Sequence, residues 1–404
     1  MTAAFLAALW APIFAVLIVA FLAVAYILIG YPLLLACFPG RLSAPVRKDP
    51  AFHPRVSILL AVHNGAPFIA PKLQSLLALH YPADLLEIIV VSDGSTDRTE
   101  AIVEECAGRR VRLLRVPRGG KAAALNAALS YATGEIIFFT DVRQIIDPDA
   151  LQHLAANFAD PTVGAVTGEL RMLDPSRPGE QADMELYWRY ELWARRHHSR
   201  IDSIFSVTGC LYALRRSLAA PLPPDTLADD ALFSLRAFFQ GYRVIFEPAA
   251  LAYDYPPAGG GEFRRKLRTL AGLWQIHARM PRLFTGANRM RFHFLSHKFS
   301  RLLLPWILLL IAAATIALPG SALRTGLLMG ELLLLVVALL DRWVPQGWPL
   351  KRVSSLTRTF FSMNLAALLS VAVVFVRPEI LWKAPTQVAV TPPDPRQKVA
   401  RRES

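Results

Sequence analysis

The stretch "LEIIVVSDGSTD" (Leu86–Asp97) decides the fold, because it joins an apolar strand to a polar turn. Its first half is a continuous aliphatic run, which is typical of a strand buried on both faces of a parallel sheet. Two similar runs flank it, "RVSILLAV" (Arg55–Val62) and "EIIFFTD" (Glu135–Asp141). We expect a further strand at 111–116 and helices at 67–79, 96–107 and 121–132. The sequence therefore predicts an α/β domain with a mostly parallel sheet.

Polar side chains follow three of these strands at the point where each strand ends. His63 and Asn64 follow the first, Ser92 and Asp93 end the second, and Asp141 ends the third. Parallel sheets bind ligands beyond the carboxyl ends of their strands. We therefore expect these side chains to converge on one ligand site.

The pattern becomes mixed after Asp149. We expect strands at 163–170, 207–214 and 242–248, and helices at 179–199 and 226–240.

Hydrophobic residues make up 54% of the 404 residues and charged residues only 19%, which is too apolar for an ordinary soluble protein. Ala4–Cys37 is long enough to cross a bilayer and lacks the basic start of a signal peptide, so we expect an anchor. Leu302–Leu318, Gly326–Leu340 and Phe360–Val376 are further candidate spans.

The net charge of +13 gathers at the ends of the expected spans. Positive charge there marks the cytoplasmic side of a membrane. The segment 264–301 interleaves cations with apolar residues, which suits a helix lying on a membrane surface. No nucleic-acid-binding signature accompanies the charge, so we expect no nucleic-acid partner. The three cysteines are scattered and indicate neither disulfides nor zinc, in keeping with a reducing cytoplasmic face.

Two motifs carry further chemistry. In "GGKAAALNAAL" (Gly119–Leu129), Lys121 opens a helix whose first amides favour anions, although a solvated lysine explains it as well. Asp229 and Asp230 start another expected helix. They are either acids stabilised by the helix dipole or the place of a general base, and the residues alone leave both open.

The order of these pieces resembles the membrane-bound glycosyltransferases of family two, which include cellulose, hyaluronan and poly-N-acetylglucosamine synthases and non-processive relatives. The resemblance rests on "VHN", "VSDGSTD", "GKAAALNAAL", "FFTD", "TGCLYALRR" and "ADDALFSLRAFFQGYRVIFEP". It covers nearly the whole chain, and "DGSTD" and "GKAAALNAAL" are its most specific parts.

The resemblance implies a GT-A fold, a nucleotide-sugar donor, inversion at the anomeric carbon and a divalent metal, Mg²⁺ or Mn²⁺. It places His63, Asn64, Ser92 and Asp93 beside the nucleobase and ribose, and Lys121 near the nucleotide. Asp141 matches the first Asp of the DxD metal motif, and Asp230 matches the Asp of the "TED" motif, the acceptor's base. Asp229 and Thr208, Gly209 and Cys210 would lie on the acceptor side.

Several positions depart from the family pattern. Gly65 replaces the Glu of "YNE", Ser92 replaces the first Asp of "DDGS", and Arg143 replaces the second Asp of DxD. The best alignment of the family's QxxRW motif falls on Arg265–Thr269. It keeps the Arg as Arg268, but Arg265 stands in place of the Gln and Thr269 in place of the Trp. The resemblance places Arg265, Lys266 and Arg268 on the acceptor side. That Trp helps hold the growing polymer in the synthases, so its loss favours single-sugar transfer.

Arg143 has three interpretations. It pairs with a phosphate beside a metal that Asp141 retains, which we favour; it replaces the metal; or it forms a structural ion pair with Asp147 or Asp149.

We therefore expect an anchor (1–40), a cytoplasmic catalytic domain (50–260), a basic interfacial segment (261–301), transmembrane or interfacial helices (302–380) and a disordered tail (385–404). The expected enzyme moves a sugar, from UDP by preference, to a lipid-linked or polysaccharide acceptor at the cytoplasmic face of a bacterial plasma membrane. The alternatives are a processive synthase and a non-catalytic membrane subunit. The basic tail prefers the cytoplasm, so we expect that Phe360–Val376 does not fully cross.

Overall fold

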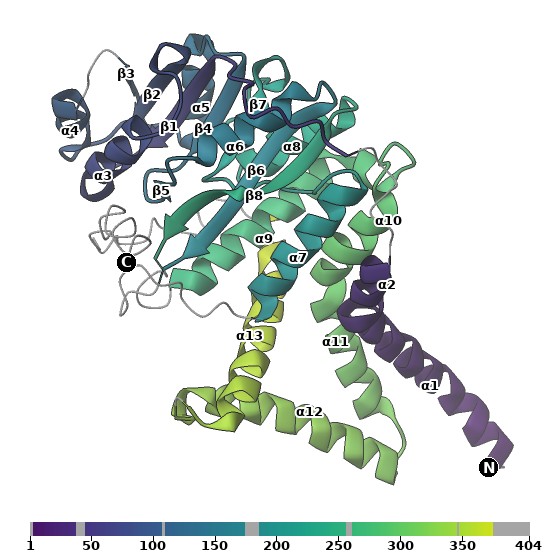
Figure 1. Ribbon diagram of the computed structural model, residues 1–404. Helices are drawn as coiled ribbons and strands as arrows, with labels where there is room; N and C mark the ends of the chain where they lie inside the picture. The colour runs from purple at the N-terminus through teal and green to yellow at the C-terminus, as the bar shows by residue number, and fades with distance from the viewer. Residues whose placement is uncertain are drawn as a thin grey trace, which may run out of the picture. The chain divides into compact units, whose positions relative to one another are not determined.

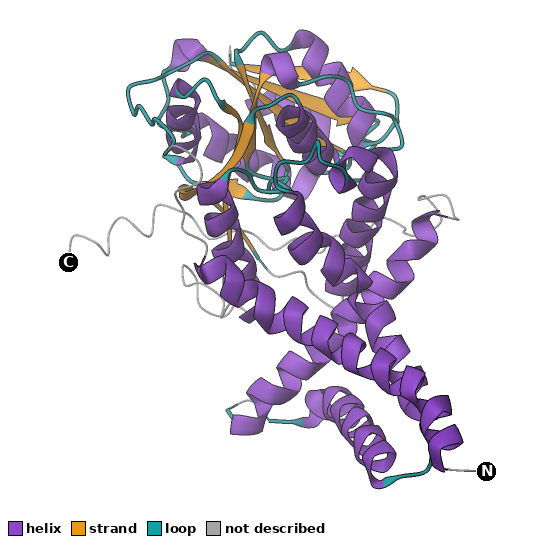
Figure 2. Ribbon diagram, turned by 90° about the vertical axis from the view of Figure 1, so that its right-hand side faces the viewer, coloured by secondary structure: helices purple, strands orange, loops and turns teal. Residues whose placement is uncertain are grey.

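The computed structural model describes residues 3–37, 45–106, 110–173, 186–255, 261–345 and 347–374. They form two compact units (Figure 1). A helical unit lies within Met1–Phe38 and Gly260–Trp382, and an α/β unit lies within Pro39–Gly259. All strands of the described residues belong to the α/β unit (Figure 2). The predicted tail, 385–404, lies outside the described residues.

The α/β unit is built on one eight-stranded sheet with the strand order β3-β2-β1-β4-β7-β6-β8-β5. Its strands are β1 (Val56–Val62), β2 (Leu86–Asp93), β3 (Val111–Val116), β4 (Ile136–Thr140), β5 (Ile145–Ile146), β6 (Val163–Met172), β7 (Tyr212–Arg215) and β8 (Arg243–Asp254). Its helices are α3 (Ala66–Leu77), α4 (Thr99–Cys106), α5 (Lys121–Tyr131), α6 (Ala150–Ala156), α7 (Leu186–Ile201) and α8 (Asp229–Phe239).

The first half of the sheet is parallel, as the sequence predicts. β1 pairs with β2 and β4, and β2 pairs with β3, all in parallel. β7 then runs antiparallel to both β4 and β6, while β8 is parallel to β6 and antiparallel to β5. The carboxyl ends of β1, β2 and β4 therefore lie at the same edge of the sheet.

Complete burial explains why the parallel strands are continuously apolar. Ile58 on β1, Ile88 on β2 and Phe138 on β4 have no exposed surface. α3 packs on this sheet through residues such as Ile69 and Leu73, which are equally buried. Each such side chain contributes about 1.5–3 kcal/mol relative to an exposed one.

Two predicted boundaries are wrong for local reasons. α4 begins at Thr99 and not at Thr96, because the Asp97 carboxylate accepts a hydrogen bond from the Thr99 amide at 3.0 Å. β7 begins at Tyr212 and not at Val207, because the Leu211 amide donates to the Thr208 carbonyl at 2.9 Å and closes a turn. The first residues of the predicted helix 179–199 lie outside the described residues.

Within its described residues, the helical unit contains three helices that are long and apolar enough to cross a membrane, namely Trp10–Cys37, Arg291–Ala317 and Ala322–Trp343. Its elements are α1 (Ala3–Ala25), α2 (Tyr31–Cys37), α9 (Gly261–Arg279), α10 (Arg291–His293), α11 (Ser300–Ala317), α12 (Ala322–Leu340) and α13 (Pro349–Ser370). Among the described residues, α13 is not one of the three candidates, although the fourth expected segment begins on it.

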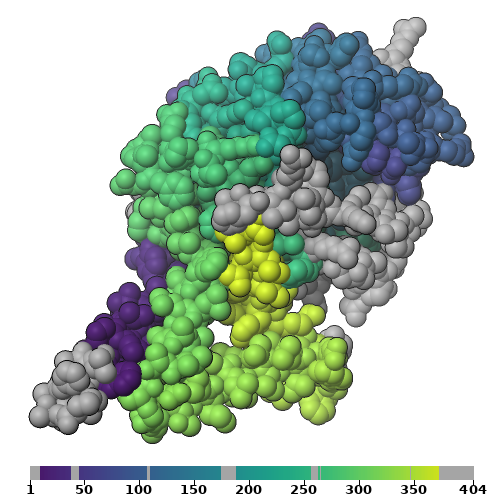
Figure 3. All heavy atoms as spheres, turned by 180° about the vertical axis from the view of Figure 1, so that it is seen from behind, coloured from purple at the N-terminus to yellow at the C-terminus, as the bar shows by residue number. Residues whose placement is uncertain are grey.

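Packing within the helical unit leaves much apolar surface exposed. α1 and α11 share a small core that contains Leu17, Ala20 and Ile311. The Trp274 indole of α9 donates to the Ser370 hydroxyl of α13 at 3.1 Å. In the most apolar stretch of α12, only 6% of the residues are buried, and the surface of this helix is visible in Figure 3. Exposed leucine surface of this kind is what a lipid environment covers.

Candidate active site

Lys121 joins two carboxylates that lie far apart in the chain, Asp141 and Asp229. Its ammonium, at the first residue of α5, lies 2.9 Å from Oδ1 of Asp141 and 3.2 Å from Oδ2 of Asp229. Asp141 directly follows β4, and Asp229 is the first residue of α8. Burial lowers the pKa of Lys121, but the two carboxylates outweigh it, so the net pKa is raised and the lysine is charged at neutral pH. Three separate elements thus present alternating charges at one place.

Asp230 lies beside Asp229 in a setting that suits a general base. Burial raises the pKa of the Asp230 carboxyl to about 6, and the neighbouring Asp229 adds to this effect while Lys121 opposes it. Its Oδ1 accepts a hydrogen bond from the Ala231 amide at 2.8 Å. A Cβ placed on Gly209 would lie 3.2 Å from its Oδ2. The glycine therefore leaves room beside the second carboxylate oxygen.

Thr208, Gly209 and Cys210 form the turn before β7. The Thr208 hydroxyl accepts a hydrogen bond from Arg195 of α7 at 2.8 Å. Cys210 is buried, and burial raises the pKa of its thiol, which is therefore neutral. Of these three predicted acceptor-side residues, Gly209 lies against Asp230.

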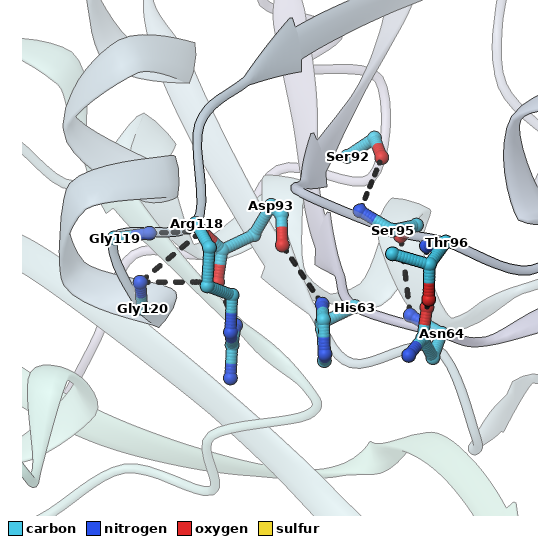
Figure 4. A network of polar contacts seen from close by, with 9 residues as sticks. All are labelled: His63, Asn64, Ser92, Asp93, Ser95, Thr96, Arg118, Gly119 and Gly120. Atoms are coloured by element: carbon cyan, nitrogen blue, oxygen red, sulfur yellow. Dashed lines mark hydrogen bonds and ion pairs between the residues drawn. The ribbon is translucent and has the colours of Figure 1, made fainter.

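A second polar network joins the ends of β1 and β2 (Figure 4). The Nδ1 atom of His63 lies 2.8 Å from the carbonyl oxygen of Asp93. Because a carbonyl only accepts, Nδ1 carries the proton, and a neutral ring then has an accepting Nε2. Asn64 has a φ of +50° and accepts from the Thr96 amide at 2.8 Å. These contacts fix the two strand ends against each other.

The Asp93 carboxylate is fully engaged by the loop before α5. It accepts hydrogen bonds from the amides of Gly119 and Gly120 at 2.7 and 3.0 Å, and it pairs with Arg118. Figure 4 shows Arg118 and His63 extending to the same side of the network. Asp93 therefore fixes the loop that precedes Lys121.

Two departures from the family pattern have local explanations. Ser92 has no exposed surface, and its hydroxyl donates to Glu100 of α4 at 2.6 Å, so it braces α4. At Gly65, a Cβ would lie 2.4 Å from a methyl group of Val62 and 3.3 Å from one of Val142. A residue larger than glycine does not fit there without displacing two valines.

Arg143 contacts Asp254, the last residue of β8. Its terminal nitrogen donates to Oδ2 at 2.5 Å and its Nε donates at 3.2 Å, while Gln144 donates to the same oxygen at 2.7 Å. The predicted partners Asp147 and Asp149 are wrong. Asp147 accepts from Tyr253 at 3.0 Å, and Asp149 lies 2.8 Å from His80.

The remaining predicted residues Arg265, Lys266 and Arg268 lie on α9, which belongs to the helical unit. The contacts described above for the candidate active site all join residues of the α/β unit.

Asp141 offers one carboxylate oxygen ligand at the carboxyl end of β4. Among the described residues, no three His, Cys, Asp or Glu side chains come together to hold an ion. Mg²⁺ needs only one or two carboxylates when substrate phosphates and water supply the other ligands. Asp141, whose side chain is 40% exposed, offers one such carboxylate. The residues present thus fit a divalent ion that arrives with a diphosphate.

Sequence reasoning missed Arg118, Asp254 and Lys72. Asp254 has no local signal, because its partner Arg143 is 111 positions away in the chain. Lys72 has a local signal in the sequence, since it lies three residues after Ile69 and four before Leu76, on the apolar stripe of α3.

Comparisons with known proteins show similarity to glycosyltransferases. Residues 57–221 match the model of Glycosyl transferase family 2. A probable glycosyltransferase of Bacillus subtilis, YdaM, is 29% identical over 215 residues, which are 50% of this chain and 51% of that protein. The poly-beta-1,6-N-acetyl-D-glucosamine synthase of Staphylococcus aureus is 26% identical over 55% of this chain and 53% of its own length. The chain thus spans about half the length of these relatives.

A solved structure extends the likeness to nearly the whole chain. The mannosyltransferase PcManGT of Pyrobaculum calidifontis, in complex with GDP-Man and Mn²⁺, has a TM-score of 0.70 and 28% sequence identity. The match covers 88% of this chain and 98% of that one. The α/β unit accordingly has a GT-A fold, and residues 57–221 within it are similar to Glycosyl transferase family 2.

Proposed function

We propose that this protein is an inverting glycosyltransferase that moves one sugar from a nucleoside diphosphate to a hydroxyl of a lipid-linked or polysaccharide acceptor. The observation that carries the proposal is the cluster in which Lys121 faces Asp141 and Asp229, with Asp230 beside them. Displacement at an anomeric carbon requires a base for the acceptor and positive charge for the leaving diphosphate. The cluster contains both.

Asp230 is the proposed base. Its carboxylate takes the proton of the acceptor hydroxyl while that oxygen attacks the anomeric carbon. The bond from the anomeric carbon to the diphosphate oxygen breaks, and the electron pair leaves with the nucleoside diphosphate. Attack from the face opposite the leaving group inverts the configuration. Gly209 leaves space for the acceptor oxygen, because a side chain there would approach Oδ2 of Asp230.

Lys121 and Asp141 are the proposed diphosphate side of the site. Lys121 stays charged because of its two carboxylate neighbours, and the first amides of α5 favour an anion at the same end of the helix. Asp141 would hold Mg²⁺ or Mn²⁺ with the donor, and the ion would neutralise charge on the leaving diphosphate. The Mn²⁺ complex of the mannosyltransferase PcManGT supports this assignment.

His63, Asn64 and Arg118 are proposed to border the nucleobase and ribose. In this view Asp93 and Ser92 act indirectly, because the carboxylate holds the glycine loop and the hydroxyl braces α4. UDP is the expected nucleotide, whereas the mannosyltransferase PcManGT was solved in complex with GDP-Man. Both nucleotides are therefore assayed.

The helical unit supports the proposed localisation and acceptor. The three candidate spans support a membrane protein, and the basic residues beside them favour a cytoplasmic catalytic domain at a bacterial plasma membrane. An acceptor on a lipid carrier or a cell-envelope polysaccharide suits that location. The synthase among the relatives supports polysaccharide chemistry, and loss of the QxxRW Trp favours single transfer.

The test is nucleoside diphosphate binding to the purified full-length protein, with and without Mn²⁺. We expect UDP or GDP to bind wild type more tightly with Mn²⁺, and Asp141→Asn to lose that enhancement. Asp84→Asn, at an exposed carboxylate of the same unit, is the control and keeps it. Absence of binding by either nucleotide under both conditions contradicts the proposal.

A further inference from the structure

Lys72 is a charged residue in a fully buried position. It lies on the face of α3 that packs on the sheet, and its relative exposure is 0%. Ile69, Leu73 and Leu76 on the same face are also fully buried. Lysine is almost never buried in this way unless its ammonium has a specific partner.

The partners of Lys72 lie at the two ends of one turn. Its Nζ donates to the Thr140 hydroxyl at 2.6 Å and to the Gln144 carbonyl at 2.8 Å. Between these two residues lie Asp141, the proposed metal ligand, and Arg143. The Thr140 hydroxyl in turn donates to the Cys210 carbonyl at 2.8 Å, which links the same point to the turn before β7.

This arrangement costs free energy that an apolar residue would not. Burial lowers the pKa of Lys72 to about 7, although the fields of Cys210, Asp141 and Asp254 act in the opposite direction. The two atoms that accept its hydrogen bonds are neutral, so neither cancels a full charge. Leucine or methionine at this position would pack on the sheet without that cost. Filling the core therefore does not explain the lysine.

We propose that Lys72 is a positioning residue for the diphosphate side of the active site, since its ammonium closes the Thr140–Gln144 turn from within the core. The inference rests on the proposed function, in which Asp141 faces the donor. The hydrogen bonds of Lys72 go to Thr140 and Gln144, so it acts by holding both ends of the turn. Groups that orient a metal ligand in this way typically change metal affinity or activity by about 10- to 100-fold when they are removed.

The experiment compares Lys72→Met with wild type in the full-length protein. We expect the affinity for UDP or GDP in Mn²⁺ to fall by about tenfold or more, because Asp141 is no longer held. The affinity for the matching nucleoside monophosphate should stay within about twofold, since the His63 and Asp93 network is untouched. A role in stability alone would change neither affinity in the folded fraction, so this difference separates the two roles. Wild-type diphosphate affinity in a folded Lys72→Met protein overturns the inference.

Thr140 gives an independent route if Lys72→Met does not fold. Thr140→Val removes one acceptor and should weaken diphosphate binding in the same direction, while Thr140→Ser keeps the hydroxyl and should bind as wild type. In the double variant Lys72→Met/Thr140→Val, the loss should be no larger than the greater single loss. Equal diphosphate binding by Thr140→Val and Thr140→Ser contradicts the proposed role of the hydrogen bond from Lys72 to Thr140.

Ser75→Ala is the matched control on the same helix. The Ser75 hydroxyl donates to the carbonyl of Lys72 at 2.8 Å, and the residue is buried. Its removal should leave both affinities unchanged. Asp141→Asn separates this inference from the proposed function. If that variant loses Mn²⁺-dependent binding and Lys72→Met does not, the positioning role alone is wrong; if both bind as wild type, the proposed function is wrong as well.

Discussion

Arg143 donates two hydrogen bonds to the carboxylate of Asp254, across the sheet edge at which the metal motif would place a second acid. Arg143, which stands where the motif has its second Asp, thus links the Thr140–Gln144 turn to the end of β8. Asp141 is left as the motif's carboxylate, with Lys121 beside it. A divalent ion at this place would depend on the diphosphate for most of its ligands.

Arg143→Met should destabilise the protein. The Asp254 side chain is 5% exposed and would lose two donors, although Gln144 and the Tyr255 amide would remain. An under-satisfied buried acid costs about 1–3 kcal/mol, and Asp254→Asn in the same protein should recover part of it. Thermal unfolding of the full-length protein checks this. An unchanged melting temperature in Arg143→Met would show that the pair contributes nothing.

Arg143→Asp should restore the second carboxylate of the DxD motif, but this variant alone should not gain a second metal ligand. The new side chain would face the buried Asp254, and like charges there oppose ionisation of both. We expect Arg143→Asp/Asp254→Asn to bind UDP or GDP with a stronger Mn²⁺ dependence than Arg143→Asp alone. Nucleotide titrations with and without Mn²⁺ measure it. Equal dependence in the two variants would argue against the tie.

Lys121→Met should weaken diphosphate binding. A hydrogen bond to a charged group is worth about 1.5–3 kcal/mol, which corresponds to a loss of roughly tenfold or more. Asp141 and Asp229 would then lose their shared cation. Nucleoside monophosphate binding is the control and should change less. Equal losses for mono- and diphosphate would place Lys121 at the nucleoside.

Activity should fall on acidification through about pH 6. Asp230 has a raised pKa of about 6 and must be ionised to accept a proton, so turnover is retained above that pH and lost below it. Asp229→Asn removes a negative neighbour and should move this limb to lower pH, whatever its effect on the maximal rate. A kcat profile between pH 4.5 and 8 gives both results, and an acid limb that stays in place in Asp229→Asn contradicts the coupling.

The parallel half of the fold and the positions of its polar strand ends were predictable, because they follow from local apolar runs. The close approach of Asp141, Lys121 and Asp229 depends on how the ends of β4, α5 and α8 come together in the fold. Local sequence does not predict this arrangement, and only the family resemblance indicated it. The tie from Arg143 to Asp254 was not predictable, since no local pattern connects a turn to a strand end so far along the chain. Lys72 was readable as a cation on an apolar stripe, but its partners depend on which strand α3 covers.

The loop geometry before α5 was also beyond local reading. Asp93 was predicted beside the nucleobase, yet its carboxylate is taken up by Arg118 and two glycine amides. Gly120 has a φ of +85°, a conformation that favours glycine and lets its amide turn toward Asp93. The sequence showed the two glycines but not the acid that they serve.

The most direct test of the account is sugar transfer by wild type and Asp230→Asn, with Ser234→Ala as control. The Ser234 hydroxyl donates to the main-chain carbonyl of Asp230 at 2.9 Å, and not to its carboxylate. Full-length protein is incubated with radiolabelled UDP- and GDP-sugars, Mn²⁺ and a bacterial membrane lipid extract. We predict label in the lipid or polymer fraction for wild type and the control. For Asp230→Asn we predict a rate lower by about 10²- to 10⁴-fold with unchanged nucleotide affinity. Transfer by Asp230→Asn at the wild-type rate would contradict the assignment of the base and, with it, the central claim.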